Sequence, residues 1–531
     1  MSARTFAGPH QRRRGSRHHR RCAALSIAGA LAAVSGMAPA GAGSAAVAPY
    51  HGGTAHSTGT GYWTPNSART FPRLVEYPDA TGTIAVLNAD GPTATRGNPF
   101  FTALGTNGRA CVTCHQPDDG MSVSVATIRA RWRATGGRDP LFAAIDGSNC
   151  PSLPQNLRKS HSLLLHHGLF RIARPWPPRD PDGRVITPQF TIQVVRDPTG
   201  CNLDPKYGLY SRHPMISVFR RPRPAANLKY VTAVGFTFDP KDGLPLPIDP
   251  ETGLRMSGNI LADARAGTLK AQVLDAMRTH LQVRGNPNPA DVAKVIAFES
   301  SLYTAQIADR VGGSLTADGA TGGPEALATG KPGELNSPQH PQWSEFFAWA
   351  RKNRARPSAT PAERAFRASV LRGIELFTKK TFLVRDSAGL NSMNFGNPVR
   401  NTCNFCHNMN HTGMDVAPGQ VDIGTTNEPR ADPQPGLPLF KLTCAPQFPP
   451  QPFLGRVVYT HDPGYALTTG KCADIGKITI QSLRGLAARP PYFSNGSAPT
   501  IRAVVDFYNR RYRIGLTERE KRDLTNFLSV L

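Results

Sequence analysis

The sequence predicts an all-α fold with extensive loops, divided into two domains. Apolar residues recur at helical spacing in both halves of the chain, for example over 268–281, 289–303 and 500–508. Proline and glycine account for 48 and 50 of the 531 residues and interrupt the segments between these helices. The motif Cys-x-x-Cys-His occurs once in each half, at 111–115 and at 403–407.

Each copy of this motif can hold one covalently attached haem. Two thiols one helical turn apart can add across the two vinyl groups of a porphyrin, and the adjacent histidine can then ligate the iron. Half of a zinc site or a thioredoxin-like redox pair is the alternative, but neither needs the trailing histidine, and no second Cys-x-x-Cys completes a four-ligand site. We therefore expect two haem c groups, with His115 and His407 as proximal iron ligands. The predicted haem-binding residues are Cys111, Cys114, His115, Cys403, Cys406 and His407.

The first 42 residues have the features of a secretory signal peptide. Seven arginines and no acidic residue accompany an apolar run from Cys22 to about Val34, which small residues follow. The run is too short to span a bilayer, and no later stretch approaches the roughly 20 apolar residues that a spanning helix needs. We expect a protein that does not span the membrane and is exported to the periplasm with its signal peptide cleaved.

The formal charge favours an acidic partner over nucleic acid. Removal of the seven arginines lowers the net charge from +25 to +18, so the exported chain stays basic. No nucleic-acid fold signature is present, and few basic residues cluster outside 351–356. Docking to an acidic redox protein or an anionic surface fits better, because charge mainly governs the rate of encounter.

Four of the nine cysteines are left once Cys22 and the haem cysteines are set aside. An even number in an oxidising compartment favours disulfides. Pairing within each half is the simplest arrangement, which joins Cys150 to Cys201 and Cys444 to Cys472. Free thiols and the other two pairings stay open.

Composition divides the chain into segments. Residues 43–95, rich in Gly, Thr, Ala and Pro, indicate a flexible and exposed lead-in. The first haem domain is predicted over 96–310 and contains a loop-rich insertion. A linker rich in Gly and Pro is predicted over 311–358, and the second haem domain over 359–531.

Local signals refine this division. Short β-like runs at 190–195 and 231–238 indicate hairpins and loops that cover a haem. Thr360 begins a helix with Pro at its first position and Glu at its third, the pattern of a capping box. Thr500 and Thr517 cap the two helices predicted at the end of the chain.

Several stretches resemble a known family. They are 474–477, 483–487, Pro-Tyr-Phe-Ser-Asn-Gly-Ser at 491–497, Thr500 and 505–509, together with both haem motifs and the helix that contains Glu299. In this order they resemble the bacterial di-haem cytochrome c peroxidase and MauG-like family, whose second domain carries Pro-Tyr-Phe-His-Asn-Gly-Ser. The resemblance covers most of 95–531. The family it points to includes peroxidases, MauG and rubber oxygenases.

The resemblance implies a fold and a division of labour between the haems. It implies two cytochrome c-like α domains with one haem c each, often with a Ca²⁺ ion between them. One haem would be low-spin and pass electrons, and the other would open a coordination site for hydrogen peroxide or oxygen. Whether the protein forms a homodimer stays open.

One position departs from the family pattern. Ser494 stands where the family usually has histidine, and serine is a poor iron ligand that cannot shuttle protons as imidazole does. Fourteen residues later, Tyr508 stands where peroxidases have an axial methionine and MauG an axial tyrosine, so the resemblance makes it a candidate metal ligand. The alternative is a core aromatic residue that packs with Ile501, Val504 and Val505.

Two further residues are candidates for catalysis. His161, in an apolar run, is the best imidazole for the sixth position of the first haem, and a hydrogen-bonded structural histidine is the alternative. Glu299 could supply the acid that helps to cleave an O–O bond. The alternative for Glu299 is a structural hydrogen bond or ion pair, since buried carboxylates are usually paired.

These observations predict a periplasmic haem oxidoreductase that is cytochrome c peroxidase-like. It would reduce hydrogen peroxide with electrons from a small donor protein, a cytochrome c or a cupredoxin. A MauG-like or rubber-oxygenase-like oxidase that uses oxygen or peroxide is the first alternative. A non-catalytic di-haem electron-transfer cytochrome is the second.

Overall fold

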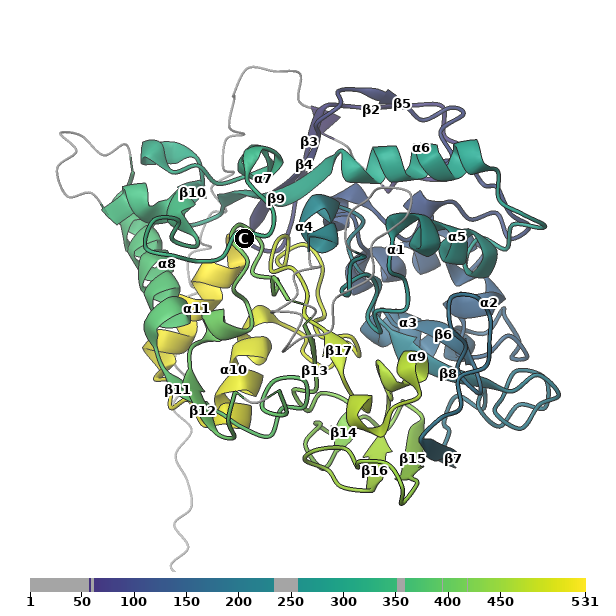
Figure 1. The fold of residues 1–531 in the computed structure, drawn as a ribbon. Helices are drawn as coiled ribbons and strands as arrows, with labels where there is room; N and C mark the ends of the chain where they lie inside the picture. Colours follow the sequence, from purple (N-terminus) through teal and green to yellow (C-terminus); the bar gives the residue numbers. More distant parts are fainter. Residues whose placement is uncertain (1–56, 59–61, 234–255, 351–358, 394, 418) are drawn as a thin grey trace, which may run out of the picture. The chain divides into compact units, whose positions relative to one another are not determined.

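The fold is mixed α and β, so the prediction of an all-α fold is wrong. The computed structural model describes residues 57–58, 62–233, 256–350, 359–393, 395–417 and 419–531. Helices take up 30% of these residues and strands 18% (Figure 1). Many of the missed strands are short, and some pair with distant segments, as 82–88 does with 302–309, so local sequence gives only a weak sign of that pairing.

A five-stranded sheet joins the predicted lead-in to the end of the predicted first haem domain and the start of the predicted linker. Its central strand β4 carries the β-branched residues Thr83, Ile84 and Val86 and pairs antiparallel with both β3 and β9. Its strands, in spatial order, are β1 (Ser57–Thr58), β3 (Leu74–Pro78), β4 (Gly82–Asn88), β9 (Leu302–Asp309) and β10 (Gly313–Ser314). Residues 62–95, predicted as part of an exposed lead-in, thus contain strands and buried side chains such as Trp63 and Tyr77.

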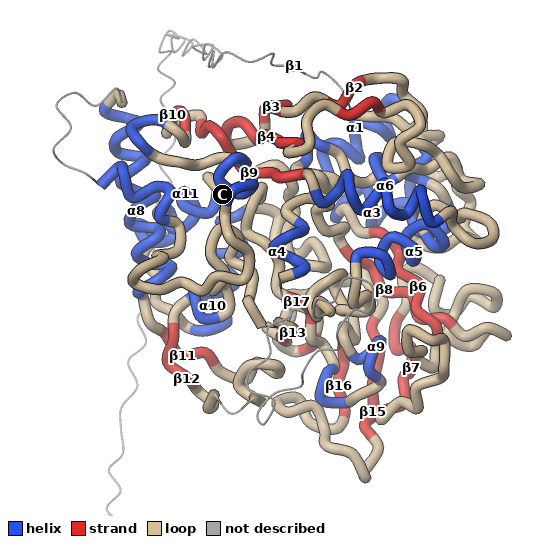
Figure 2. Tube along the Cα trace, turned by 45° about the horizontal axis from the view of Figure 1, so that its top comes forward, coloured by secondary structure: helices blue, strands red, loops and turns tan. Residues whose placement is uncertain are grey.

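A four-stranded antiparallel sheet joins distant parts of the chain. β15 pairs on one side with β16 and on the other with β7, which confirms the strand predicted at 190–195. Figure 2 shows these strands in red, running side by side. The spatial order is β14 (Asn427–Glu428), β16 (Val457–Thr460), β15 (Leu439–Cys444) and β7 (Phe190–Arg196).

The remaining strands form two-stranded ribbons, all antiparallel. They are β2 (Thr70–Phe71) with β5 (Thr93–Ala94), β6 (Phe170–Pro175) with β8 (Met215–Arg220), β11 (Phe382–Val384) with β12 (Val399–Asn401), and β13 (Gln420–Val421) with β17 (Ile478–Thr479). The other predicted run, 231–238, begins within helix α4 (Leu228–Thr232), and its residues from 234 on lie outside the described residues.

The helices predicted at 268–281 and 289–303, and those predicted to begin at Thr360, Thr500 and Thr517, are all present. Each begins at a polar cap, and Thr360 and Thr517 form the predicted capping boxes with Glu363 and Glu520. The long helices are α1 (Val125–Thr135), α5 (Leu269–Thr279), α6 (Pro289–Ser300), α8 (Pro361–Lys379), α10 (Ile501–Tyr512) and α11 (Glu518–Ser529). The short ones are α2 (Ala144–Gly147), α3 (Ser162–His167), α4, α7 (Pro324–Thr329) and α9 (Ala466–Thr469). Helix α11 packs against α8 and α10.

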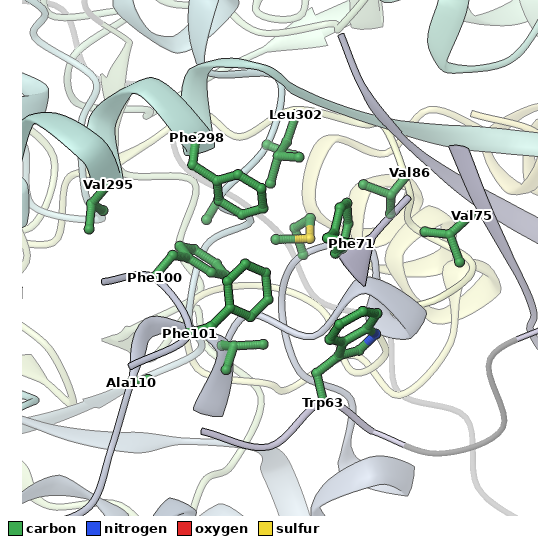
Figure 3. Close-up of a cluster of buried hydrophobic side chains, with 14 of the residues drawn as sticks. Trp63, Phe71, Val75, Val86, Phe100, Phe101, Ala110, Val295, Phe298 and Leu302 are labelled. Atoms are coloured by element: carbon green, nitrogen blue, oxygen red, sulfur yellow. The ribbon is translucent and has the colours of Figure 1, made fainter. Parts of the chain in front are cut away.

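An aromatic core fixes the segment that leads into the first haem motif. The ring of Phe298, on α6, lies 4.9 Å from that of Phe100 and 5.2 Å from that of Phe101, centroid to centroid (Figure 3). Phe71 and Trp63 extend this cluster toward the five-stranded sheet. Because Cys111 packs against the same cluster, burial of these rings sets the position of the motif relative to α6.

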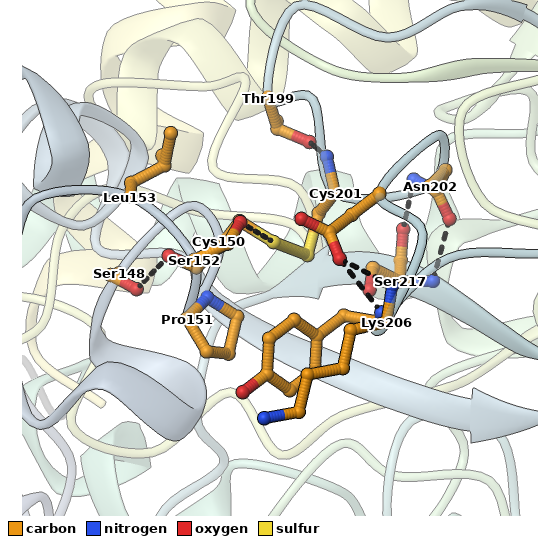
Figure 4. Close-up of a disulfide and its surroundings, with 12 residues drawn as sticks. Ser148, Cys150, Pro151, Ser152, Leu153, Thr199, Cys201, Asn202, Lys206 and Ser217 are labelled. Atoms are coloured by element: carbon orange, nitrogen blue, oxygen red, sulfur yellow. Dashed lines mark hydrogen bonds between the residues drawn. A yellow bond between two sulfur atoms is a disulfide. The ribbon is translucent and has the colours of Figure 1, made fainter. Parts of the chain in front are cut away.

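Both predicted disulfides are confirmed. Cys150 is bonded to Cys201 (Figure 4). Cys444, at the end of β15, is bonded to Cys472. Among the described residues, no helix is both long enough and apolar enough to cross a membrane. The predicted signal peptide lies outside the described residues, as does the basic run at 351–356, and the division into two haem domains with a linker stays a prediction.

Removal of the Cys150–Cys201 bridge should lower the stability of the protein. The bridge spans 51 residues, and the entropy of a loop of that length corresponds to about 4 kcal/mol. A Cys150→Ser/Cys201→Ser double variant should therefore lose about this much free energy of unfolding in urea. Thiol labelling of wild type in denaturant checks the bridges themselves. Reduction before labelling should make four more cysteines reactive than labelling without reduction, the four that form the two bridges. Four reactive thiols without reduction would contradict both bridges.

Candidate functional site

Each haem-binding motif begins in one turn of 3-10 helix. η1 covers Cys111–Thr113, and η7 covers Cys403–Phe405. The amide of the motif histidine donates to the carbonyl of the first cysteine in both copies, at 3.1 Å for His115 and 3.3 Å for His407. The backbone therefore follows the same path through both motifs.

One hydrogen bond from the ring to the backbone orients each motif histidine. Nδ1 of His115 donates to the carbonyl of Met121 at 3.0 Å, and Nδ1 of His407 donates to that of Gly413 at 2.6 Å. Both acceptors lie six residues after the histidine and have left-handed backbone, with φ of 61° and 62°. With the proton on Nδ1, Nε2 keeps its lone pair for a metal ion.

The reactive side chains of both motifs remain accessible. The four motif cysteines are free thiols and are half-buried, as are His115 and His407. In contrast, Val112 and Thr113, between the cysteines of the first motif, are fully buried. Open space therefore lies next to the sulfurs and imidazoles, where a haem would have to sit.

A cavity of about 210 Å³ opens at the first motif. Cys111, Cys114 and His115 line it, and α5 and α6 contribute Val273 and Glu299. The rest of its lining includes Arg221, Arg223, Asn259, Met277, Met414 and Arg484. Its wall therefore combines apolar side chains with several buried guanidinium groups.

Two of these guanidinium groups lack an anionic partner. Arg221 and Arg223 form no salt bridge with any described residue, and Nε of Arg223 has no hydrogen-bond partner. Burial lowers the pKa of Arg221 to about 10 and that of Arg223 to about 9. A buried cation is costly unless an anion offsets it. Haem propionates are such anions, so the residues around the first motif fit a haem.

Glu299 is a buried carboxyl group beside the first motif. Its residue is 6% exposed, and its side chain forms no hydrogen bond or salt bridge within the described part of the chain. Burial raises the pKa of Glu299 to about 8. Burial also raises the pKa of Cys111, and the nearby Glu299 adds to that effect. The alternative for Glu299, a structural hydrogen bond or ion pair, is therefore not found among the described residues. Its catalytic role stays a prediction.

His161 lies in the core and does not line the cavity. Its Nδ1 faces the carbonyl of Gly147 at 2.7 Å and its Nε2 that of Gln155 at 2.9 Å. Its ring packs against Trp132 and Phe142. This environment favours the alternative of a hydrogen-bonded structural histidine, and it gives the predicted ligand role no support.

Tyr508 lies near the cysteines of the second motif. It belongs to the apolar cluster that contains Cys403 and Cys406, whereas Val505 packs in a different cluster. Burial raises the pKa of Tyr508 well above its ordinary value, and the charges of Tyr512 and both cysteines add to this effect. A phenolate at this position would need a cation, and ferric iron is one. Its ligand role stays a prediction.

The neighbouring tyrosine has a different environment. The ring of Tyr512 is stacked on that of Tyr508, with centroids 6.3 Å apart, and its hydroxyl bonds to that of Ser387 at 2.9 Å. The hydroxyl of Tyr508 has no such partner among the described residues. Ser494 is buried, and its carbonyl accepts a hydrogen bond from the amide of Arg221, which lines the first cavity.

Sequence reasoning missed one group of polar residues at the first cavity. His280, Asp146 and Arg109 all line it, and His280 Nδ1 lies 2.5 Å from a carboxylate oxygen of Asp146. His280 lies 134 positions from Asp146 and 171 from Arg109 in the sequence, so no local motif joins them. Only His280 has a detectable context, since it lies near the end of the helix predicted over 268–281.

No cluster of metal-binding side chains marks the predicted calcium site among the described residues. Within the described ranges, no three His, Cys, Asp or Glu side chains gather as a metal site. Calcium also binds backbone carbonyls and water, so this observation concerns side-chain clusters alone. The calcium ion stays a prediction.

Replacement of Glu299 by glutamine should change how stability depends on pH. The folded state holds the Glu299 proton more tightly than the unfolded state, so its contribution to stability is full below about pH 4.5 and is lost as the pH rises through about 8. Relative to wild type, Glu299→Gln should therefore gain stability with pH, by up to about 1.4 kcal/mol per unit in this window. Urea unfolding at pH 5 and pH 8 measures this difference. A constant difference would contradict the raised pKa.

Comparison with known proteins gives a partial match. No family model matches the chain. It is 37% identical over 81 residues to "Cytochrome-c peroxidase IdrP1" of Denitromonas iodatirespirans, which covers 13% of this chain and 22% of that protein. The chain thus spans about a fifth of the length of this relative. A solved structure, "a MauG-like protein associated with microbial copper homeostasis", covers 58% of this chain and 80% of its own at 17% identity, with a TM-score of 0.25. The chain is therefore similar, over a limited segment, to a cytochrome-c peroxidase.

Proposed function

We propose that the protein is a periplasmic di-haem c-type oxidoreductase that reduces hydrogen peroxide with electrons from a small redox protein. The observation that carries this proposal is the cavity at the first motif. There the predicted haem-binding residues Cys111, Cys114 and His115 line one space together with Glu299, whose carboxyl has no partner among the described residues. The segment of similarity to a cytochrome-c peroxidase supports the same reaction class.

Different residues around the first motif would bind different parts of a haem. Cys111 and Cys114 would form its thioether bonds, and Nε2 of His115 would ligate its iron. Arg221 and Arg223 would receive its propionates, which offsets two buried charges. When bound, the haem supplies the oxidation and reduction chemistry.

Glu299 would hold a proton inside the cavity. Because its pKa is raised to about 8, the carboxyl is largely protonated at neutral pH and can donate a hydrogen bond or a proton. A protonated carboxyl among apolar walls also imposes no unpaired charge on the site. This property suits the delivery of protons to a peroxide oxygen.

The second motif is better suited to electron transfer in this proposal. Phe382, Tyr508 and Tyr512 pack around Cys403 and Cys406 in one apolar cluster. Apolar surroundings favour small polar substrates less than the cavity at the first motif, which also contains a carboxyl group. The net charge of +18 that remains without the predicted signal peptide favours encounter with an acidic electron donor, such as a cytochrome c or a cupredoxin.

A MauG-like oxidase is the second candidate, and one observation favours it. Tyr508 lies beside both cysteines of the second motif, and its hydroxyl has no hydrogen-bond partner among the described residues. An anionic oxygen ligand would favour ferric iron and lower the potential of that haem, since the axial ligand is a main determinant of potential. Such a haem would suit storage of oxidising equivalents better than a peroxidase that must first be reduced.

Steady-state peroxide reduction tests the favoured function. Wild-type holoprotein should consume hydrogen peroxide and oxidise two equivalents of reduced small cytochrome c or cupredoxin for each peroxide. The variants Cys111→Ala/Cys114→Ala and Cys403→Ala/Cys406→Ala should each lose one haem by mass spectrometry and lose turnover, by at least 100-fold. Wild type that carries two haems and leaves peroxide untouched with both donors would contradict the proposal.

The Tyr508→Phe variant separates the two candidates. It removes the hydroxyl and keeps the ring that packs beside Tyr512. If Tyr508 ligates iron, the optical and EPR spectra of the second haem should change, and its potential should rise. Val504→Ala, on the same helix, is the matched control and should leave these spectra unchanged. Unaltered spectra in Tyr508→Phe would make Tyr508 a packing residue and would remove the support for the MauG-like candidate.

A further inference from the structure

We propose that His280 is a catalytic acid–base residue of the first haem site and that Asp146 positions it. This inference rests on the proposed reduction of peroxide and identifies a second proton-carrying group besides Glu299. His280 follows α5, and both residues line the cavity that contains Cys111, Cys114 and His115. Among the described residues that line this cavity, His115 and His280 are the only histidines.

Asp146 is held as a buried anion. One carboxylate oxygen lies 2.5 Å from Nδ1 of His280, and the other forms a short ion pair with Nη1 of Arg109. The side chain of Asp146 is 5% exposed. Burial alone would raise its pKa, but Arg109 and His280 together lower the pKa below the ordinary value. The group at Nδ1 of His280 is therefore a carboxylate that accepts a hydrogen bond.

The same contacts fix this unit relative to the first motif. Arg109 stands two residues before Cys111 and also donates to the carbonyls of Pro140 and Leu141, each at 2.7 Å. The carbonyl of His280 accepts from the side chain of Asn107 at 2.8 Å. The imidazole is thus anchored through its ring and its backbone to the segment that leads into the motif.

This anchoring leaves one nitrogen available for chemistry. With its proton donated from Nδ1 to Asp146, the ring presents the lone pair of Nε2. No described residue bonds to this nitrogen, and the side chain is 33% exposed. His161 contrasts with this arrangement, because carbonyls face both of its ring nitrogens. A paired carboxylate that orients an imidazole is the arrangement by which proteins prepare a general base.

The proposed step moves one proton between the two oxygens of hydrogen peroxide. Nε2 of His280 accepts the proton of one oxygen and returns it to the other as the O–O bond breaks, so that the second oxygen leaves as water and the imidazole ends neutral. Two electrons from the reduced donor protein and two protons from solvent convert the remaining oxygen to a second water. The sum is H₂O₂ + 2 e⁻ + 2 H⁺ → 2 H₂O.

Binding of hydrogen cyanide to the ferric holoprotein tests this role without turnover. The neutral acid must lose its proton to bind iron as an anion, so a base near the iron accelerates the reaction. In His280→Ala, the association rate followed optically should fall by about 100-fold or more, the scale of general base catalysis. Added imidazole should restore part of the rate. Asp146→Asn should slow binding and should not respond to imidazole, and His166→Gln, at an exposed histidine of α3, should match wild type.

The outcomes separate this inference from the proposed function. Equal cyanide rates in wild type, His280→Ala and the volume-conserving His280→Gln would overturn it. So would a wild type that binds no cyanide, or a resting spectrum in which His280→Ala loses a low-spin signal, since His280 would then be an iron ligand. A rate that depends on His280 in a protein that reduces no peroxide would support the acid–base role and reject only peroxide as the substrate.

Discussion

The hydrogen bond from the motif imidazole to a backbone carbonyl is the constraint on which both sites depend. It fixes the proton of His115 and of His407 on Nδ1 and leaves Nε2 free for iron. Both acceptor carbonyls belong to left-handed residues, Met121 and Gly413. Glycine adopts this conformation at little cost, but a methionine there costs on the order of 1 kcal/mol, which the surrounding aromatic core must offset. The turn after each motif is thus part of the metal site and not merely a connection.

Among the described residues, most of the buried arginines around the first cavity are paired with carboxylates, and two are not. Most of its guanidinium groups are neutralised by the protein: Arg220 donates to Asp462 at 2.6 Å and to Asp263 at 2.7 Å, and this network joins segments 242 residues apart. Arg221 and Arg223 are the exceptions among the described cavity residues. A buried pair contributes little net stability, but a buried cation without a partner is costly, so two unpaired arginines beside one another indicate an anion that the polypeptide itself does not supply.

Much of the helical framework and of the haem-binding chemistry could be predicted from local sequence. Capping residues such as Thr360 and Thr517 act within one turn, so their effect is visible in a few letters. The strand at 190–195 could be predicted, but the central pairing of the five-stranded sheet could not. There β4 pairs with β9 more than two hundred residues away, and pairing of this kind leaves only a weak local pattern. The same limit applies to the site: an apolar context drew attention to His161, whereas the carboxylate that distinguishes His280 comes from another part of the chain.

Resting-state EPR of the ferric protein tests the central claim most directly, because it reports the ligand field at each iron separately. Two haems of unequal environment predict two distinct ferric signals, one of them high-spin and therefore open to a substrate. The high-spin signal should vanish in Cys111→Ala/Cys114→Ala and persist in Cys403→Ala/Cys406→Ala, which assigns the open site to the cavity beside Glu299 and His280. Two low-spin signals in wild type, with no open position at either iron, would contradict a catalytic first haem.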